Sequence, residues 1–125
     1  MGALAIAFAA LNGLIAVGAG AWAAHGADPS VAELARTAST YQMFHALALF
    51  GTGLYLGRPV AGMARRLLLL AALAFALGIV LFSGSLYSLV LGGPSFLAPV
   101  GGITLMAGWL ALAVAALLDL GPGRR

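Results

Sequence analysis

The stretch LLLLAALAFALGIVLFSGSLYSLVLGGPSFLAPVGGITLMAGWLALAVAALL, residues 67–118, decides the fold. Its 52 consecutive residues include no Asp, Glu, Lys or Arg, and as a single helix they would extend for about 78 Å. A hydrocarbon core about 30 Å thick needs only about 20 residues. The segment GGPSFLAPVGG, residues 92–102, is rich in helix-breaking glycine and proline. The stretch therefore predicts two membrane spans, at residues 67–91 and 99–118.

The rest of the chain belongs to the same class. Residues 1–27 carry no Asp, Glu, Lys or Arg and predict a span at 3–24, and the 21 uncharged residues between Arg36 and Arg58 predict another at 37–57. With 63% hydrophobic and 7% charged residues and a mean hydropathy of +1.10, a soluble globular protein is excluded. We predict one all-α domain, residues 1–125, formed by a four-helix transmembrane bundle. A cleaved signal peptide is the alternative for the first span, but its basic n-region is missing.

The arginines predict the direction of the spans. Five of the six fall on one side of the four-span arrangement: Arg58, Arg65, Arg66, Arg124 and Arg125. Arg36 alone falls on the other side. Basic residues are retained in cytoplasmic loops, so both termini should be cytoplasmic. The net charge of +3 comes from these arginines, which lie at the edges of the spans. We therefore expect no nucleic-acid partner.

The first external connection, residues 28–38, predicts a short amphipathic helix at the outer interface, before the chain turns into the second span. Asp28 or Ser30 can cap it, Pro29 suits a first helical position, and Ser30 and Glu33 have the spacing of a capping box. Glu33 and Arg36 should form a solvated pair that contributes little.

Polar side chains collect in the outer leaflet of this arrangement. Tyr41 and His45 lie four residues apart in the second span, and the third span carries LFSGSLYSL at 81–89. A buried imidazole or phenol needs a hydrogen-bond partner in a membrane, so we expect these side chains to point into the bundle. The candidate ligand-binding residues are His25, Tyr41, His45, Ser83, Ser85 and Tyr87.

Three interpretations of these residues stay open. The residues can form interhelical hydrogen bonds that only hold the bundle together, they can form a ligand or permeation site, or they can bind a metal or haem. Histidine titrates near physiological pH, and ionisable groups inside a membrane mark functional sites by default. The chain has no cysteine and no carboxylate within a span to complete a metal site. We therefore expect no catalytic residues, no metal and no cofactor, and we expect that the protein is not an enzyme.

Small residues at helical spacing predict close helix contacts, either within one chain or between copies in a homo-oligomer. They are Gly53 and Gly57 in the second span, Ala16, Gly20 and Ala24 in the first, and Ala107, Ala111 and Ala115 in the fourth.

Five ordered motifs resemble a known family. GAWAAHG at 20–26, YQMFHALAL at 41–49, LFSGSLY at 81–87, APVGG at 98–102 and GW at 108–109 resemble the marks of domain of unknown function 423, a family of small bacterial inner-membrane proteins similar to animal transmembrane protein 256. The resemblance covers nearly the whole chain and implies a multi-pass protein with four spans in the bacterial inner membrane. It implies no activity.

Two functions from different classes follow. The first is a binding or permeation protein whose outer-leaflet pocket holds a small molecule, a proton or a lipid headgroup. The second is a structural or accessory subunit whose polar cluster only locks the packing of the helices. A haem or metal carrier is a third, weaker alternative. The lipid bilayer is the one partner common to all of them.

Overall fold

Four helices follow one another in the computed structural model, which describes residues 1–120. They are α1 (Gly2–His25), α2 (Pro29–Leu56), α3 (Gly62–Val90) and α4 (Ala98–Asp119). The prediction of an all-α protein is confirmed. Glycines lie at the breaks around α3: Gly62, its first residue, and Gly92, two residues after its end, have φ angles of +60° and +81°, a region that a residue with a Cβ atom rarely adopts.

Three of these helices, α1, α3 and α4, are long and apolar enough to cross a membrane. The second helix, α2, is less clearly a span, because its first turns carry polar and charged residues. At 28 residues it is about 42 Å long, so it exceeds a hydrocarbon core of about 30 Å.

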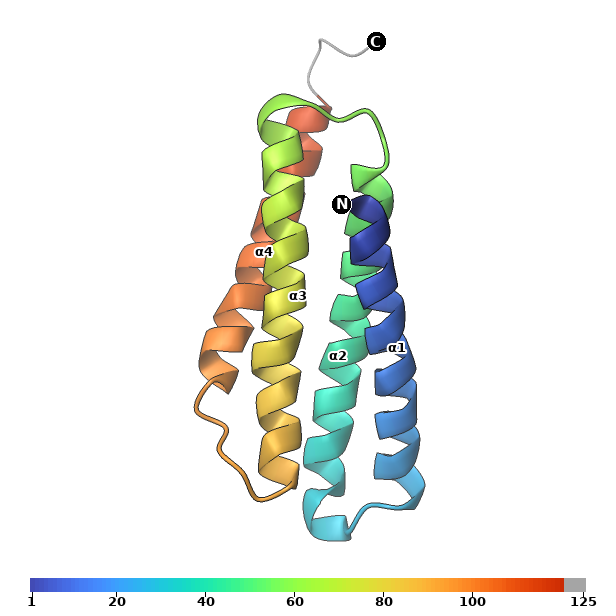
Figure 1. Ribbon diagram of the computed structural model, residues 1–125. Coiled ribbons are helices and arrows are strands. Elements are labelled where there is room, and N and C mark those ends of the chain that lie inside the picture. Colours follow the sequence, from blue (N-terminus) through green and yellow to red (C-terminus); the bar gives the residue numbers. More distant parts are fainter. Residues whose placement is uncertain (121–125) are drawn as a thin grey trace.

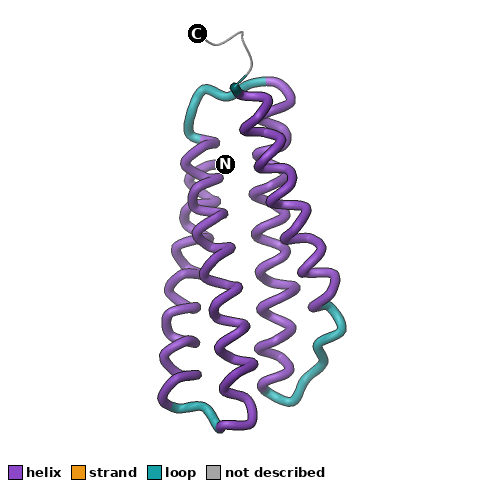
Figure 2. Tube along the Cα trace, turned by 180° about the vertical axis from the view of Figure 1, so that it is seen from behind, coloured by secondary structure: helices purple, strands orange, loops and turns teal. Residues whose placement is uncertain are grey.

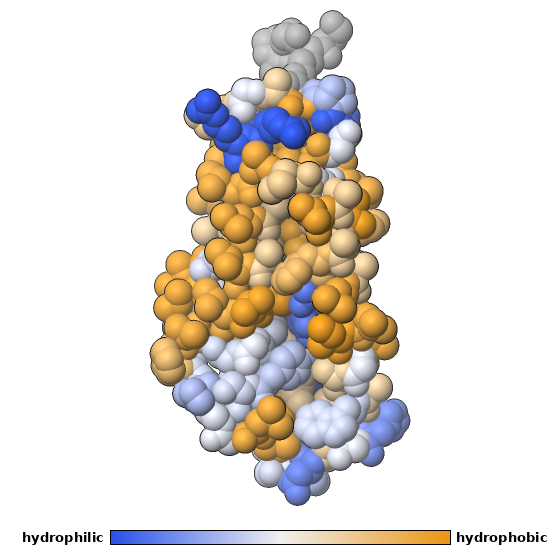
Figure 3. Space-filling model, in the orientation of Figure 1, coloured by the Kyte–Doolittle hydropathy of each residue, from blue (hydrophilic) through white to orange (hydrophobic). Residues whose placement is uncertain are grey.

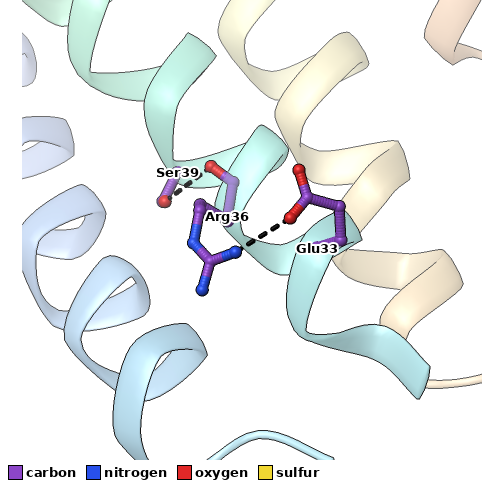
Figure 4. Close-up of polar contacts among 3 residues, drawn as sticks. All are labelled: Glu33, Arg36 and Ser39. Carbon is purple, nitrogen blue, oxygen red and sulfur yellow. Dashed lines mark hydrogen bonds and ion pairs between the residues drawn. The ribbon is translucent and has the colours of Figure 1, made fainter. Parts of the chain in front are cut away.

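The structure corrects the expected break between residues 28–38 and the second span, because α2 runs unbroken from Pro29 to Leu56. The Asp28 side chain caps it, accepting hydrogen bonds from Ser30 N at 2.9 Å and Ser30 Oγ at 2.7 Å. These bonds lower the pKa of the Asp28 carboxyl, the side-chain bond more than the backbone bond. Glu33 completes no capping box but accepts from Arg36 at 2.8 Å (Figure 4). With a cap in front and no helix breaker behind, nothing stops the helix near residue 38.

The helices pack in chain order. The first, α1, lies along α2, and α4 lies along α3, while α2 and α3 join these two hairpins (Figure 1). By contrast, α1 and α3 make little contact. The connection at 57–61, the N-terminus and the described end of α4 lie together at one pole (Figure 2), which we call the arginine end because Arg58, Arg65 and Arg66 lie there. The connections 26–28 and 91–97 lie at the other pole, the polar end.

Glycines set the closest helix contacts. A Cβ atom on Gly53 would lie 3.0 Å from the carbonyl oxygen of Gly2, and one on Gly101 would collide with the backbone of Phe82. The predicted small-residue contact at Gly53 therefore forms within the chain, between α1 and α2, whereas Gly57 is exposed.

The other two predicted rows of small residues are only partly buried within the chain. Ala16 and Ala115 are buried, but Ala24 and Ala107 are exposed. The buried face of α4 instead carries Gly101, Leu105, Gly108 and Ala115. Its register is therefore set by glycines packed on α3, where a Cβ atom on Gly108 would lie 2.9 Å from the Phe75 ring, and the alanine spacing alone did not reveal it.

The apolar core has two parts. One, in the middle of the bundle, contains Ala9, Leu49, Ala71, Phe75, Ile79 and Leu105. The second lies toward the arginine end and contains Leu56, Val60, Ala64, Leu68 and Ala115. Figure 3 shows the corresponding exterior, an apolar band with hydrophilic residues at both poles and a paler, more polar area toward the polar end.

Candidate functional site

A chain of buried side-chain amides crosses the middle of the bundle. Tyr87 Oη on α3 donates to Gln42 Oε1 on α2 at 2.7 Å, and Gln42 Nε2 donates to Asn12 Oδ1 on α1 at 2.9 Å. Asn12 Nδ2 in turn donates to the carbonyl of Phe8, one turn earlier in α1, at 2.9 Å. Three helices are thus tied together by consecutive hydrogen bonds.

The directions of the helices explain how Tyr87 and Gln42 meet. Side chains on a helix lean toward its N-terminus. Because α2 and α3 are antiparallel, Gln42 leans toward the polar end, whereas Tyr87, near the end of α3, leans toward the middle. The predicted inward direction of Tyr87 is confirmed by this bond.

Sequence reasoning missed Asn12 and Gln42, although they are 6% and 4% exposed and form the centre of the chain of hydrogen bonds. A signal was present: Asn12 is the one amide side chain in α1, and Gln42 stands between Tyr41 and Met43 in α2. An amide that enters lipid must find a partner in the bundle, so both residues belonged with the candidates.

His45 lies one turn further along α2 and is 8% exposed. Its Nδ1 is 2.7 Å from the carbonyl oxygen of Tyr41. A carbonyl can only accept, so Nδ1 carries a proton and donates to it. Among the described residues, no hydrogen bond reaches Nε2. The rings of Phe75 on α3 and Trp109 on α4 each lie 6.1 Å from the imidazole, between centroids.

Tyr41 lies at the surface of the bundle. Its side chain is 44% exposed, and its ring packs on Phe82 at 4.8 Å and against His45 at 6.0 Å. The expectation that Tyr41 points inward is wrong, because the aromatic contact with Phe82 holds it at the outer edge of the α2–α3 interface. Its backbone carbonyl, rather than its phenolic hydroxyl, accepts the hydrogen bond from His45.

The three remaining candidates are placed differently. Ser83 is 1% exposed, and its Oγ has no hydrogen-bond partner within residues 1–120. It lies one helical turn from Tyr87 on α3, and Ser85 is buried nearby at 8%. His25 is exposed at the last position of α1, and no described contact joins it to the other candidates.

Hydrogen bonds join Asn12, Gln42 and Tyr87, and His45, Ser83 and Ser85 are buried on the same helices, α2 and α3. We call this set of six side chains the polar cluster. It contains no carboxylate, and in the described part of the chain no three His, Asp or Glu side chains lie close enough together to hold a metal ion. Hydrogen bonding and proton exchange at His45 are the chemistry that it offers.

Comparison with known proteins places the chain in context. Residues 19–103 match the family described as "Protein of unknown function (DUF423)". The chain is 36% identical to the UPF0382 inner membrane protein YgdD of Escherichia coli strain K12, over 88% of this chain and 86% of that one. It is 38% identical to the UPF0382 membrane proteins of Staphylococcus epidermidis and Bacillus subtilis (YwdK), over 90% of this chain and 93% or 94% of theirs. No solved structure matches the chain.

Proposed function

The chain belongs to the DUF423 family and is a multi-pass protein of the bacterial inner membrane, and from this premise we propose that it is a binding protein rather than an enzyme. The polar cluster holds a small polar molecule, of the size of water, or a proton between α2 and α3. In this proposal all four helices cross the membrane, and the cluster lies from its middle toward the periplasmic leaflet.

The observation that carries this proposal is the orphaned hydroxyl of Ser83. Buried polar atoms nearly always have a partner, and an exception calls for an occupant such as ordered water. A serine within a helix can also bond to the carbonyl four residues earlier, but Ser83 does not. Tyr87, one turn further along α3, already bonds to Gln42, so the free hydroxyl of Ser83 is left for an additional molecule.

His45 supports the same proposal. Its Nε2 has no hydrogen bond among the described residues, and its Nδ1 is fixed by the Tyr41 carbonyl. The imidazole is thereby held in one orientation, with a second nitrogen free to accept a proton or a hydrogen bond.

Binding fits this arrangement better than conduction. A permeation path needs polar groups along its length, but the core toward the arginine end is built from Leu56, Val60, Ala64, Leu68 and Ala115. Catalysis is disfavoured because no acid accompanies His45. Asp28 and Glu33 lie exposed at the polar end, and Asp119 accepts from Tyr55 at the arginine end.

A second candidate function is that of a structural or accessory subunit. It is favoured by the bonds from Asn12 through Gln42 to Tyr87, which satisfy one another and need no ligand. The binding function requires Ser83 Oγ and His45 Nε2 to interact with a bound molecule or proton, whereas the structural function requires no such interaction.

The first experiment is Ser83→Ala, with unfolding measured in detergent micelles. If Ser83 Oγ holds a bound molecule, its loss should destabilise the protein by about 1 kcal/mol, the usual contribution of a hydrogen bond. If it holds nothing, removing an unsatisfied group should leave the stability unchanged or raised, and that result favours the structural subunit. Ser88→Ala, on the same helix but half-buried at its end, is the matched control.

Native mass spectrometry of the gently extracted protein tests for a heavier occupant. A reproducible extra mass that disappears in His45→Ala, but not in His25→Ala, would support binding at the cluster. A bare protein with the same mass in both variants would support the structural alternative and limit any occupant to water or a proton.

We further propose that the arginine end faces the cytoplasm. Arg58, Arg65 and Arg66 lie there, against Arg36 at the polar end; Arg124 and Arg125, which the prediction also counted, lie outside the described residues. The sequence has no cysteine, so single cysteines report cleanly. Ser30→Cys should react with a membrane-impermeant maleimide in intact spheroplasts, and Met63→Cys only after lysis. The reverse pattern would refute this orientation.

A further inference from the structure

The polar cluster leaves a second feature of the molecule unused, a groove between α1 and α3 in the half of the bundle toward the arginine end. It has a volume of about 580 Å³. It exists because α1 and α3 make little contact: each packs on α2, and α2 forms the floor between them. Leu49 and Leu56 of that floor are 1% and 5% exposed, whereas Leu4 and Leu73 on the walls are 69% and 57% exposed.

The length of the groove matches one leaflet of a membrane. It extends along α3 from Arg66 to Ala76, a rise of about 15 Å along the helix axis. A hydrocarbon core is about 30 Å thick, so the groove covers about half of it, beginning at the arginine end.

The side chains of the groove distinguish a lipid chain from another helix. Helices associate in membranes through small residues that allow close approach of their backbones. The walls here carry the large side chains of Leu4, Phe8 and Leu73 beside the small Ala5, Ala72 and Ala76, whereas the glycines Gly53, Gly101 and Gly108 are already engaged within the chain. Flexible leucine walls around a narrow slot suit an acyl chain.

The positive charge of Arg66 at the arginine end of the groove favours an anionic lipid headgroup. Arg66 is exposed and lines the groove at its arginine end, and no carboxylate within residues 1–120 lines it. Of the described carboxylates of a second copy in the same orientation, Asp119 is the one at that depth, and it accepts from Tyr55 Oη at 2.9 Å. A phosphate, in contrast, is a partner that an arginine binds strongly.

We propose that this groove binds one acyl chain of an anionic phospholipid, with the phosphate on Arg66. The site does not depend on the function proposed for the polar cluster. Its assignment to the cytoplasmic leaflet rests on the orientation proposed above.

The test is native mass spectrometry of delipidated protein that is titrated with phosphatidylglycerol or phosphatidylcholine carrying identical acyl chains. The wild type should retain phosphatidylglycerol in preference to phosphatidylcholine. Arg66→Gln should reduce that preference about fivefold, the effect of one basic residue near an anionic lipid surface. Arg58→Gln is the matched control: it removes the same charge at the same end, but Arg58 lies over the Tyr55 ring at 5.4 Å from its centroid and should change the preference less than about twofold.

A second pair of variants tests the slot itself. Ala76→Phe fills the groove from α3 and should reduce the retention of both lipids. Leu77→Phe, at an exposed neighbouring position outside the groove, should leave it unchanged. Ser83→Ala, in the polar cluster, should also leave the lipid preference unchanged, so the two proposals can fail separately.

Three results would overturn the proposal. The first is equal retention of the two lipids by the wild type, and the second is an equal effect of Arg58→Gln and Arg66→Gln. The third is the release of a second protomer, rather than a lipid, by Ala76→Phe, which would identify the groove as a contact between copies of the chain.

Discussion

The bond between Tyr87 and Gln42 should be a measurable part of the stability of this protein. Removing the phenolic hydroxyl in Tyr87→Phe leaves Gln42 Oε1 without its 2.7 Å partner, at a position where Gln42 is 4% exposed. Replacing Gln42 with methionine, which is similar in length, removes both this bond and the 2.9 Å bond to Asn12. The two changes and their combination form a double-mutant cycle.

The expected magnitudes follow from the number of bonds that each change breaks. Interhelical hydrogen bonds in a membrane average about 0.6 kcal/mol and reach about 1.7. Tyr87→Phe breaks one bond and should lower the free energy of unfolding by about 0.6–1.7 kcal/mol. Gln42→Met breaks two and should lower it by about 1–3 kcal/mol. Because both variants remove the same Tyr87–Gln42 bond, the double variant should fall short of additivity by about 0.6–1.7 kcal/mol.

The assay is reversible unfolding in mixed micelles, followed by circular dichroism. Tyr41→Phe is the matched control, because the Tyr41 phenol lies at the surface and makes no described hydrogen bond; it should change the stability by less than about 0.5 kcal/mol. Additive effects of the two substitutions, or a Gln42→Met variant as stable as the wild type, would refute the role assigned to these bonds.

Two further predictions concern the backbone and the ends of the helices. Gly101→Ala should destabilise the protein by about 1–3 kcal/mol in thermal unfolding, because the new Cβ atom would collide with the backbone of Phe82, whereas Gly84→Ala, with open space around it, should be neutral or up to about 1 kcal/mol more stable. The lowered pKa of Asp28 means that its cap stabilises α2 fully above the unfolded pKa, near 3.8, and that this contribution is lost as the pH falls through the folded value. Hydrogen exchange of the first turn of α2 should therefore accelerate relative to the rest of the helix below about pH 4, and it should not do so in Asp28→Asn; the same acceleration in both proteins would contradict the assignment.

Much of the fold was predictable because glycine and proline occur at the breaks between helices. Both ends of α1 and of α4 lie one residue from those predicted, because helix breakers and charges bracket their apolar runs. The third helix, α3, begins at Gly62, five residues before the predicted start at 67, because Arg65 and Arg66 continue the helix beyond the apolar run. The beginning of α2 was not predictable from hydropathy. Polar residues outside a membrane can continue the same helix, and only the cap at Asp28 indicates where it starts.

The site was less predictable than the fold. Helical spacing placed Tyr41 and His45 on one face, but the burial of each depends on how far the packed face extends around the helix, and Tyr41 packs on the Phe82 ring at the surface. Asn12 and Gln42 carry neither a titratable nor a hydroxyl group, so they were not predicted. The burial of an amide in lipid is as strong a constraint as that of a histidine, because both must find partners inside the bundle.

The order of packing has a consequence for biosynthesis. The two hairpins, α1 with α2 and α3 with α4, are each closed by their own contacts, so the first can assemble in the membrane while the second is still being translated. In the first hairpin alone, Asn12 and Gln42 can already be bonded to each other. Gln42 Oε1 then accepts its hydrogen bond from Tyr87 when the second hairpin packs against the first. Two fragments divided within residues 57–61 and expressed together should therefore find each other and reconstitute the protein.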